Sequence, residues 1–303
     1  MLSLLGALPG AVAQGLIWGI MAIGIYITFR ILDFPDMTVD GSITTGAAVC
    51  VMLISAGQPV WLAMLAATGA GCLAGLVTGI LHTFMGIPDI LAGILTQLSL
   101  YSINLKIMGK ANQALNVRQH KLLVSLQYNS GVPFYQNTLF IVAIALVILI
   151  GAMYWFFGTE KGASIRATGS NPKMSRAQGI NTSANKVIAL MISNGIVGLA
   201  GAFLAQYNGF SDVQMGRGAI VIGLAAIIIA EALFGKFVHN FALILGSVTV
   251  GAVIYFIVYQ TVIWLGLDAD LLKLLSAVVV AIFLAVPYWK KHYFGRKGGK
   301  KNA

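Results

Sequence analysis

The sequence predicts an all-α, polytopic membrane protein with about nine transmembrane helices. Its 303 residues are 58% hydrophobic and only 9% charged, whereas a soluble domain carries about a quarter charged residues. Apolar stretches of about 20 residues recur along the chain, and this is the length at which a helix spans a bilayer. The alternation of polar and apolar residues typical of a membrane β-barrel is absent. This composition therefore excludes a soluble globular protein and favours a bundle of membrane helices.

The positive charge lies in two clusters beside apolar segments, and the chain has a net charge of +10. The clusters occupy the central loop and the tail from 289 to 303: Lys161, Arg166, Lys173, Arg176 and Lys186, then Lys290, Lys291, Arg296, Lys297, Lys300 and Lys301. The positive-inside rule assigns both clusters to the cytoplasm, so we expect a cytoplasmic C-terminus and a tail that contacts anionic lipid. No aromatic residues interleave with the central charges, so nucleic acid is not expected as a partner.

The first predicted span runs from about Ala11 to Ile31. It contains Gly15 and Gly19, four residues apart, a pattern that permits close helix contact. The residues before it lack the basic start of a secretory signal, and no charge precedes Arg30. We therefore expect an uncleaved first helix with its N-terminus outside.

The segment after it, Asp33–Gly46, reads DFPDMTVDGSITTG and combines three acids, one proline and two glycines. It leads into an apolar run, Ala47–Ser55, that is too short to span a bilayer alone. One interpretation is a half-spanning helix that enters the membrane through irregular backbone, which is tolerated where protein or a water-filled cavity surrounds it. The alternative is a cytoplasmic turn followed by a plain helix from about Thr38, with all three acids in water.

Two further spans follow, from about Val60 to Thr83 and from about Ile90 to Met108. The first carries three glycines four residues apart, which predict one smooth face for tight packing: Gly71, Gly75 and Gly79. The second contains Gln97 and Asn104. These amides would either hydrogen-bond between helices, which is the commoner use, or line a route for a solute. Two cysteines, Cys50 and Cys72, lie in apolar stretches and are interpreted as small buried hydrophobes.

The polar loop Gly109–Asn137 falls outside by alternation of the spans, although its basic residues oppose the positive-inside rule. The next span, about Thr138 to Phe157, leads into the central segment Gly158–Lys186, the longest strongly polar interruption of the chain. Within that segment Thr159 can cap a short helix, and Gly169 can close it in the left-handed conformation.

A second short helix is predicted directly after the first. Ser170 or Asn171 can cap it, Pro172 suits its first turn, and Gly179 can end it. Two capped helices between apolar spans indicate an ordered surface for docking, and the alternative is an ordinary cytoplasmic loop held positive for topology.

The second half of the chain continues the pattern of spans and turns. The predicted spans are Val187–Gln206, Ala219–Leu233, Phe241–Ile263 and Leu271–Tyr288, joined by an external stretch, Tyr207–Gly218, and by short turns. Glu231 lies near the inner end of its span, where water or Lys236 could stabilise it. A carboxylate within a span is otherwise a candidate functional residue.

The sequence lacks the motifs of an enzyme. It contains no G-x-x-x-x-G-K-[ST] phosphate loop, no H-E-x-x-H and no G-x-S-x-G. The histidines are scattered, so no metal site is expected: His82, His120, His239 and His292. What remains is a membrane body with an ordered polar loop and no energy source of its own, so we expect a transport subunit rather than an enzyme, with a partner docked on that loop.

The segment EKGASIRATGSNPKMSRAQGIN resembles the cytoplasmic coupling segment of permease subunits in bacterial ABC importers for branched-chain amino acids, ribose and nucleosides. The matching residues are Gly162, Arg166, Ala167, Gly169, Asn171, Pro172, Ala177, Gly179, Ile180 and Asn181. The stretches RILDFPDMTVDGSITTGAAV, NLKIMGKANQALN and EALFG look like a subgroup linked to tryptophan or tyrosine uptake. In the wider family a Gly-Gly pair is usual where this chain has Ala230-Glu231, which puts a transfer of pore residues from sugar permeases in doubt.

The resemblance implies a type II ABC importer-like permease, one transmembrane domain over residues 1–303, in the bacterial cytoplasmic membrane. Two copies would form the pore, ATP and magnesium would bind to separate ATPase subunits, and a binding lipoprotein would deliver the solute, so no cofactor is expected on this chain. The short helix Pro172–Gln178 would sit in a groove of the ATPase. The implied coupling residues are Gly162, Arg166, Gly169, Asn171, Pro172, Lys173, Arg176, Gly179 and Asn181.

For the translocation pathway we expect polar residues at membrane depth or at helix entries: Asp40, Thr44, Gln97, Asn194 and Glu231. Asp40 could meet the amino group of an amino-acid solute. The alternative function is an ion-coupled secondary transporter, in which Asp40 and Glu231 would sense protons or sodium. The scarcity of ionisable residues within the spans makes this alternative the weaker one.

Overall fold

The computed structural model describes residues 2–116, 122–126, 137–235 and 237–265, with positions 274, 277, 278, 281 and 285. The described chain is mainly helical, as predicted. Its elements are α1 (Leu2–Tyr26), η1 (Ile27–Ile31), α2 (Val39–Ser55), α3 (Val60–Thr83), α4 (Asp89–Met108), β1 (Asn112–Ala114), α5 (Thr138–Gly158), α6 (Glu160–Ser170), α7 (Pro172–Ala177), α8 (Thr182–Asn208), β2 (Phe210–Asp212), α9 (Ala219–Phe234) and α10 (Phe241–Trp264).

Six helices of the described chain are long and apolar enough to cross a membrane. They are Leu8–Ile31, Val60–Thr83, Asp89–Met108, Thr138–Gly158, Thr182–Asn208 and Phe241–Trp264. α2 and α9 are apolar but shorter, with 17 and 16 residues. The predicted last span, from Leu271 to about Tyr288, and the basic tail lie outside the continuously described residues.

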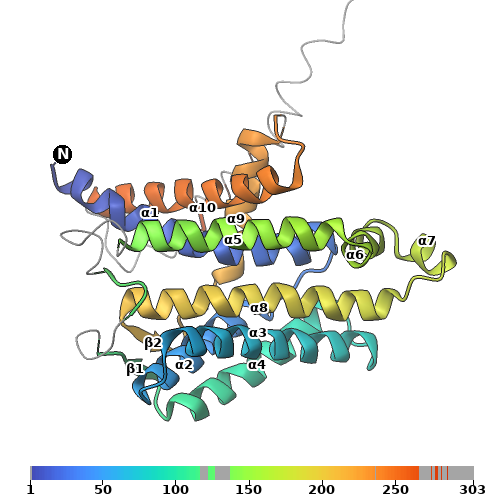
Figure 1. Cartoon of the computed structure of the whole chain (residues 1–303), viewed down its shortest axis with the longest axis horizontal. Coiled ribbons are helices and arrows are strands. Elements are labelled where there is room, and N and C mark those ends of the chain that lie inside the picture. The colour runs from blue at the N-terminus through green and yellow to red at the C-terminus, as the bar shows by residue number, and fades with distance from the viewer. Residues whose placement is uncertain are drawn as a thin grey trace, which may run out of the picture.

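The long helices α1, α3, α5, α8 and α10 lie roughly along one common direction, with α8 in the middle of the bundle (Figure 1). α8 packs against α1, α2 and α3, and α1 also packs against α9 and α10. The short helices α6 and α7 lie at one end of the bundle, and β1 and β2 lie at the opposite end (Figure 1). The predicted coupling segment therefore lies at one end of the molecule.

Three glycines of α3 allow it to approach α8 closely, as the sequence predicts. A Cβ on Gly71 would lie 2.1 Å from the carbonyl oxygen of Asn194, and one on Gly75 would lie 2.2 Å from that of Leu190. A Cβ on Gly79 would lie 3.0 Å from Val187. Such distances are far inside van der Waals contact, so only glycine fits at Gly71 and Gly75.

α2 is a short helix that begins beside the middle of α8. The preceding segment is irregular, and Asp36 within it is buried, with its Oδ1 accepting from the Thr38 backbone N–H at 2.9 Å. Its other oxygen accepts from Nδ2 of Asn194 at 2.6 Å, and Asn194 lies near the midpoint of α8. The alternative with three solvated acids is right about the helix start near Thr38 and wrong about Asp36. Burying a carboxylate without partners is costly, and these two hydrogen bonds supply partners to Asp36.

Two features of the backbone were not predicted. The end of the first span is a π-helix, η1, which carries Arg30. β1 and β2 form an antiparallel pair in which Asn112 lies opposite Asp212. This pair joins the loop after α4 to the stretch after α8, so both lie at one end of the bundle, opposite α6 and α7 (Figure 1). The alternation of spans therefore predicted correctly that the loop after α4 and the stretch after α8 lie at the same end, whereas the basic residues of that loop favoured the end with α6 and α7.

Candidate functional site

The segment that resembles a coupling segment is held in shape by three side-chain caps. Thr159 accepts from the Gly162 N–H at 3.3 Å and begins α6, and Asn171 accepts from the Met174 N–H at 3.0 Å and begins α7. Asn181 begins α8 by accepting from the backbone N–H of Ala184 at 3.0 Å. Each cap satisfies a backbone donor that a helix start otherwise leaves free. The predicted caps at Thr159 and Asn171 are confirmed.

The two glycines of this segment have different roles. Gly179 has φ +80° and ends the turn after α7, as predicted, and no atom lies within 4 Å of a Cβ built on it. The prediction that Gly169 closes α6 in the left-handed conformation is wrong, because α6 continues to Ser170. A Cβ on Gly169 would lie 1.9 Å from the carbonyl oxygen of Ile31. Gly169 is therefore required by the contact between α6 and the end of the first span.

Side-chain hydrogen bonds brace α6 and α7 against their neighbours. Nη2 of Arg166 donates to the carbonyl oxygen of Phe157 at 2.8 Å, which ties α6 to the end of α5. Nδ2 of Asn185, on α8, donates to Thr168 of α6 at 3.0 Å. Nε of Arg176 donates to the Thr182 hydroxyl at 2.8 Å, which ties α7 to α8. These bonds tie α6 to α5 and α8, and α7 to α8.

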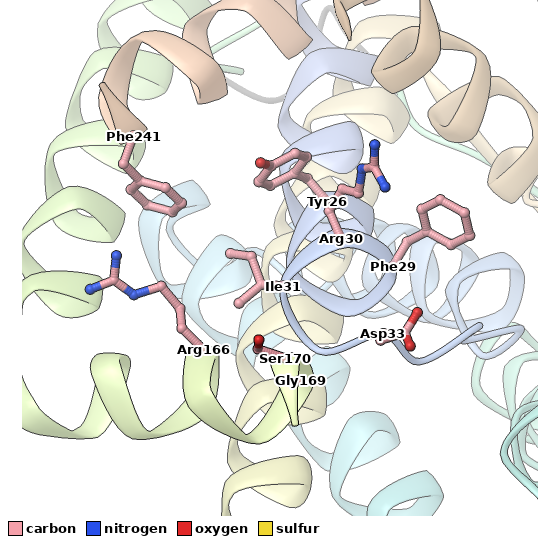
Figure 2. Close-up of a pocket in the computed structure, with 9 residues that line it drawn as sticks. All are labelled: Tyr26, Phe29, Arg30, Ile31, Asp33, Arg166, Gly169, Ser170 and Phe241. Carbon is pink, nitrogen blue, oxygen red and sulfur yellow. The ribbon is translucent and has the colours of Figure 1, made fainter. Parts of the chain in front are cut away.

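A cavity of about 430 Å³ marks the joint between α6 and the transmembrane body. Figure 2 shows side chains from three parts of the chain around it: Tyr26, Arg30 and Asp33 near the end of the first span, Arg166 on α6, and Phe241 at the start of α10. The joint is lined by charged and aromatic groups and is not filled by a continuous apolar contact. The cavity therefore lies beside the close contact that Gly169 of α6 makes with Ile31.

The outer surface of α7 is the part of the segment that a partner could reach. Lys173 and Met174 are exposed on it, and the Met174 side chain is 58% exposed. Met174 is not among the coupling residues expected from the sequence. The sequence does show one large apolar side chain within this polar, six-residue helix. The position of the helix at the tip of the bundle is seen only in the structure.

Three of the five residues predicted for the translocation pathway share a second cavity. Asp40 and Thr44 of α2 and Gln97 of α4 line a space of about 360 Å³, together with Asn104 and Arg217. Asp40 is not free there, because its Oδ2 accepts from the Gly218 N–H at 2.9 Å and its Oδ1 from the Ile220 N–H at 3.0 Å. This carboxylate caps α9 from a different helix, an interaction that favours an anion at a helix N-terminus.

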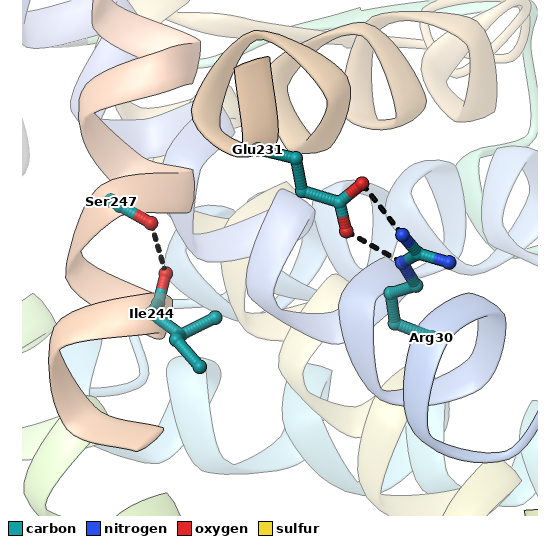
Figure 3. A network of polar contacts seen from close by, with 4 residues as sticks. All are labelled: Arg30, Glu231, Ile244 and Ser247. Atoms are coloured by element: carbon teal, nitrogen blue, oxygen red, sulfur yellow. Dashed lines mark hydrogen bonds and ion pairs between the residues drawn. The ribbon is translucent and has the colours of Figure 1, made fainter. Parts of the chain in front are cut away.

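The other two predicted pathway residues lie elsewhere. Asn194 is fully buried, donates to Asp36 and accepts from the Ser42 hydroxyl at 2.6 Å, so its side chain holds α2 against α8. Glu231 forms an ion pair with Arg30, with distances of 2.5 Å to Nε and 2.7 Å to Nη2 (Figure 3). The predicted partner of Glu231, Lys236, lies outside the described residues.

The ion pair predicts a double-mutant experiment. If the importer that the sequence resembles is assembled with this chain, Arg30→Glu should lower its ATP-driven uptake severalfold, because the substitution places two carboxylates together where η1 meets α9. The reversed pair, Arg30→Glu with Glu231→Arg, should recover most of that loss. The side chains are 51% and 38% exposed, so the effect on the free energy of unfolding should stay near ~1 kcal/mol or below. Uptake by the reversed pair no better than by Arg30→Glu alone would contradict a direct interaction.

Comparison with known protein families and sequences agrees with the resemblance seen in the sequence. The family described as the branched-chain amino acid transport system permease component matches residues 8–287. The chain belongs to this family of ABC importer permeases. This permease is 42% identical over 272 residues to a tyrosine transport system permease protein of Clostridioides difficile (strain R20291), covering 90% of this chain and 88% of that protein. It is 27% identical over 274 residues to a fructose import permease protein of Bifidobacterium longum (strain NCC 2705), covering 88% and 74% of the two chains.

The fold of this permease is also found among solved structures. A solved ABC transporter assigned to the metal-chelate type, in an inward-facing conformation, superposes with a TM-score of 0.52 at 15% identity. The match covers 93% of this chain and 85% of that chain. The permease is thus a non-catalytic, multi-pass membrane subunit of a bacterial ABC importer, and such importers use ATPase and binding-protein partners.

Proposed function

We propose that this permease imports an aromatic amino acid, with two copies forming the pore and residues 158–186 transmitting movements of the ATPase. A tyrosine transport permease as a relative with 42% identity supports the solute class. ATP and magnesium bind on the ATPase subunits, and a binding lipoprotein delivers the solute from outside. The chain has about nine spans, counting α2, α9 and the last predicted span, with a cytoplasmic tail.

The observation that carries the coupling role is the bracing of α6 and α7. The two helices are capped, hydrogen-bonded to α5 and α8, and located at one end of the bundle. A stiff element transmits a displacement that a flexible loop would absorb. Lys173 and Met174 face outward from α7, where the ATPase is placed by this proposal.

The ion-coupled alternative is disfavoured by the interactions of its two carboxylates. Asp40 accepts backbone N–H groups of α9, and Glu231 is paired with Arg30 at the other end of α9. Each carboxylate therefore already has a partner of complementary charge or polarity. The family also couples transport to ATP rather than to an ion gradient.

Two substitutions test the coupling role. Gly179→Ala should uncouple ATP hydrolysis from uptake, because φ +80° is strained for any residue with a Cβ, and Arg166→Ala should do the same by releasing α6 from Phe157. We expect the ratio of solute imported to ATP hydrolysed to fall about tenfold, measured in proteoliposomes that contain the complete importer. For Gly179→Ala this fall corresponds to backbone strain of about 1–2 kcal/mol.

Matched controls lie on the same segment. Gly158→Ala adds the same methyl group at a glycine with open space and an ordinary φ, and Lys161→Ala removes an exposed cation from the same helix as Arg166. Both should keep the wild-type ratio. If Gly179→Ala and Arg166→Ala also kept it, the coupling assignment would fail.

A further inference from the structure

The cavity shared by α2 and α4 contains a polar side chain without a partner. Asn104 is 1% exposed, and neither Nδ2 nor Oδ1 of its amide has a hydrogen-bond partner among the described residues. Buried polar groups are nearly always hydrogen-bonded, in lipid as in a protein core. Asn104 also lines the cavity of about 360 Å³, so the missing partner has room to bind there.

The remaining walls of this cavity supply both apolar and charged groups. Leu98 and Tyr101 of α4 line it with large side chains, and Tyr101 is 44% exposed. Arg217, on the segment before α9, is exposed, and among the described residues its guanidinium makes one hydrogen bond, at 3.4 Å, to Oε1 of Gln214. A guanidinium carries five N–H donors, so Arg217 keeps donors for an anion. The volume lies in the range of about 300–1,000 Å³ found for small-molecule sites.

We propose that this cavity holds the transported amino acid and that Asn104 hydrogen-bonds a polar hydrogen on its aromatic ring, that of a phenol or an indole. The inference rests on the proposed function and adds a specificity residue to it. A phenol hydroxyl donates and accepts, and a carboxamide does both in return. Tyr101 and Leu98 pack against the ring, and Arg217 binds the carboxylate. Gln97, half-buried in the same wall, is the second amide in reach of the solute.

Such a site discriminates by leaving Asn104 unpaired when the wrong solute binds. Phenylalanine fills the same space as tyrosine but offers nothing to the buried amide. A site that hydrogen-bonds a hydroxyl rejects the analogue that lacks it, because the buried polar groups are then left without partners. The permease therefore contributes its own preference for tyrosine over phenylalanine, in addition to that of the binding protein.

The test compares uptake of L-tyrosine with uptake of L-phenylalanine by the complete importer in proteoliposomes. Asn104→Leu should lower the tyrosine-to-phenylalanine ratio about five- to tenfold, mainly through loss of tyrosine uptake. The binding protein is the same in every arm, so a change of ratio belongs to the permease. Ser102→Ala, on an exposed face of the same helix, should keep the wild-type ratio.

A second measurement needs neither ATPase nor binding protein. L-tyrosine should raise the Tm of the purified wild-type permease and of Ser102→Ala more than L-phenylalanine does, and this difference should vanish in Asn104→Leu. Asn104→Leu should fold, because the amide it removes has no partner; Tyr101→Leu, on an exposed side chain, offers a second variant that should lower uptake of both solutes.

An unchanged ratio and an unchanged Tm difference in Asn104→Leu would overturn the inference while the proposed function stood. Absence of ATP-driven tyrosine uptake in the wild type would instead count against the proposed function. A tyrosine-specific Tm shift lost in Asn104→Leu would still support the cavity as a binding site in that case. A wild-type permease whose Tm responds equally to both amino acids would overturn the inference that Asn104 selects tyrosine.

Discussion

Met174→Asp should abolish most ATP-driven uptake while leaving the permease folded in the membrane. Met174 is 58% exposed on α7, the helix at the tip of the bundle, so its substitution breaks no internal packing. An apolar side chain in a partner groove is a common anchor of protein interfaces, and its loss costs about 2 kcal/mol or more of binding free energy. A carboxylate in the same groove adds an unpaired buried charge. We expect uptake to fall at least about thirtyfold at limiting ATPase concentration, following that free energy.

The control for this substitution is Met85→Asp. Met85 is 63% exposed, in the turn after α3, so the same chemical change is made at a comparably exposed position outside α6 and α7. Uptake and the Tm of both purified variants are measured side by side. Normal uptake by Met174→Asp, or an equal loss in Met85→Asp, would contradict a specific role for α7.

Gly71→Leu should destabilise the permease more than any surface substitution considered above. A Cβ at Gly71 would lie 2.1 Å from the Asn194 carbonyl oxygen, so α3 and α8 must separate or the helices must bend. Overpacking of this kind costs about 1–3 kcal/mol. The same displacement would disturb Asn194, whose amide holds Asp36 and Ser42. We expect a clear fall in Tm and in the amount of permease in the membrane.

Gly69→Leu provides a closely matched control. It lies two residues earlier on α3, and no atom lies within 4 Å of a Cβ built on it. Its Tm should equal that of the wild type or exceed it slightly, because leucine favours a helix more than glycine does. Equal Tm values for Gly69→Leu and Gly71→Leu would show that the contact between α3 and α8 is looser than described.

Features set by local sequence could be predicted well. The helix predicted from Thr138 to Phe157 is observed as Thr138–Gly158, and the one predicted from Ala219 to Leu233 as Ala219–Phe234. Apolar length, caps and a glycine with positive φ are properties of neighbouring residues. Gly169 shows where the local rule fails, because the identity of that residue is set by Ile31, far away in the sequence.

Features that depend on contacts between distant segments could not be predicted. Nothing near Arg30 or Glu231 in the sequence indicates that these residues, 201 positions apart, form an ion pair. The same holds for Asp40, which caps α9 across 178 positions. Asp40, Thr44 and Gln97 were predicted from the sequence and do share a cavity. In a sequence, however, a polar residue that lines a cavity, such as Gln97, cannot be distinguished from one that holds two helices together, such as Asn194.

The coupling role of α7 is tested most directly by photo-crosslinking from position 174 in the assembled importer. A photoreactive residue replaces Met174 in one variant and Met85 in the other, and the complexes are illuminated in membranes containing the partner ATPase. We predict an adduct with the ATPase from position 174 and none from position 85. An adduct from position 85 alone, or none from position 174 in a complex that still imports its solute, would contradict the docking of the ATPase on α7.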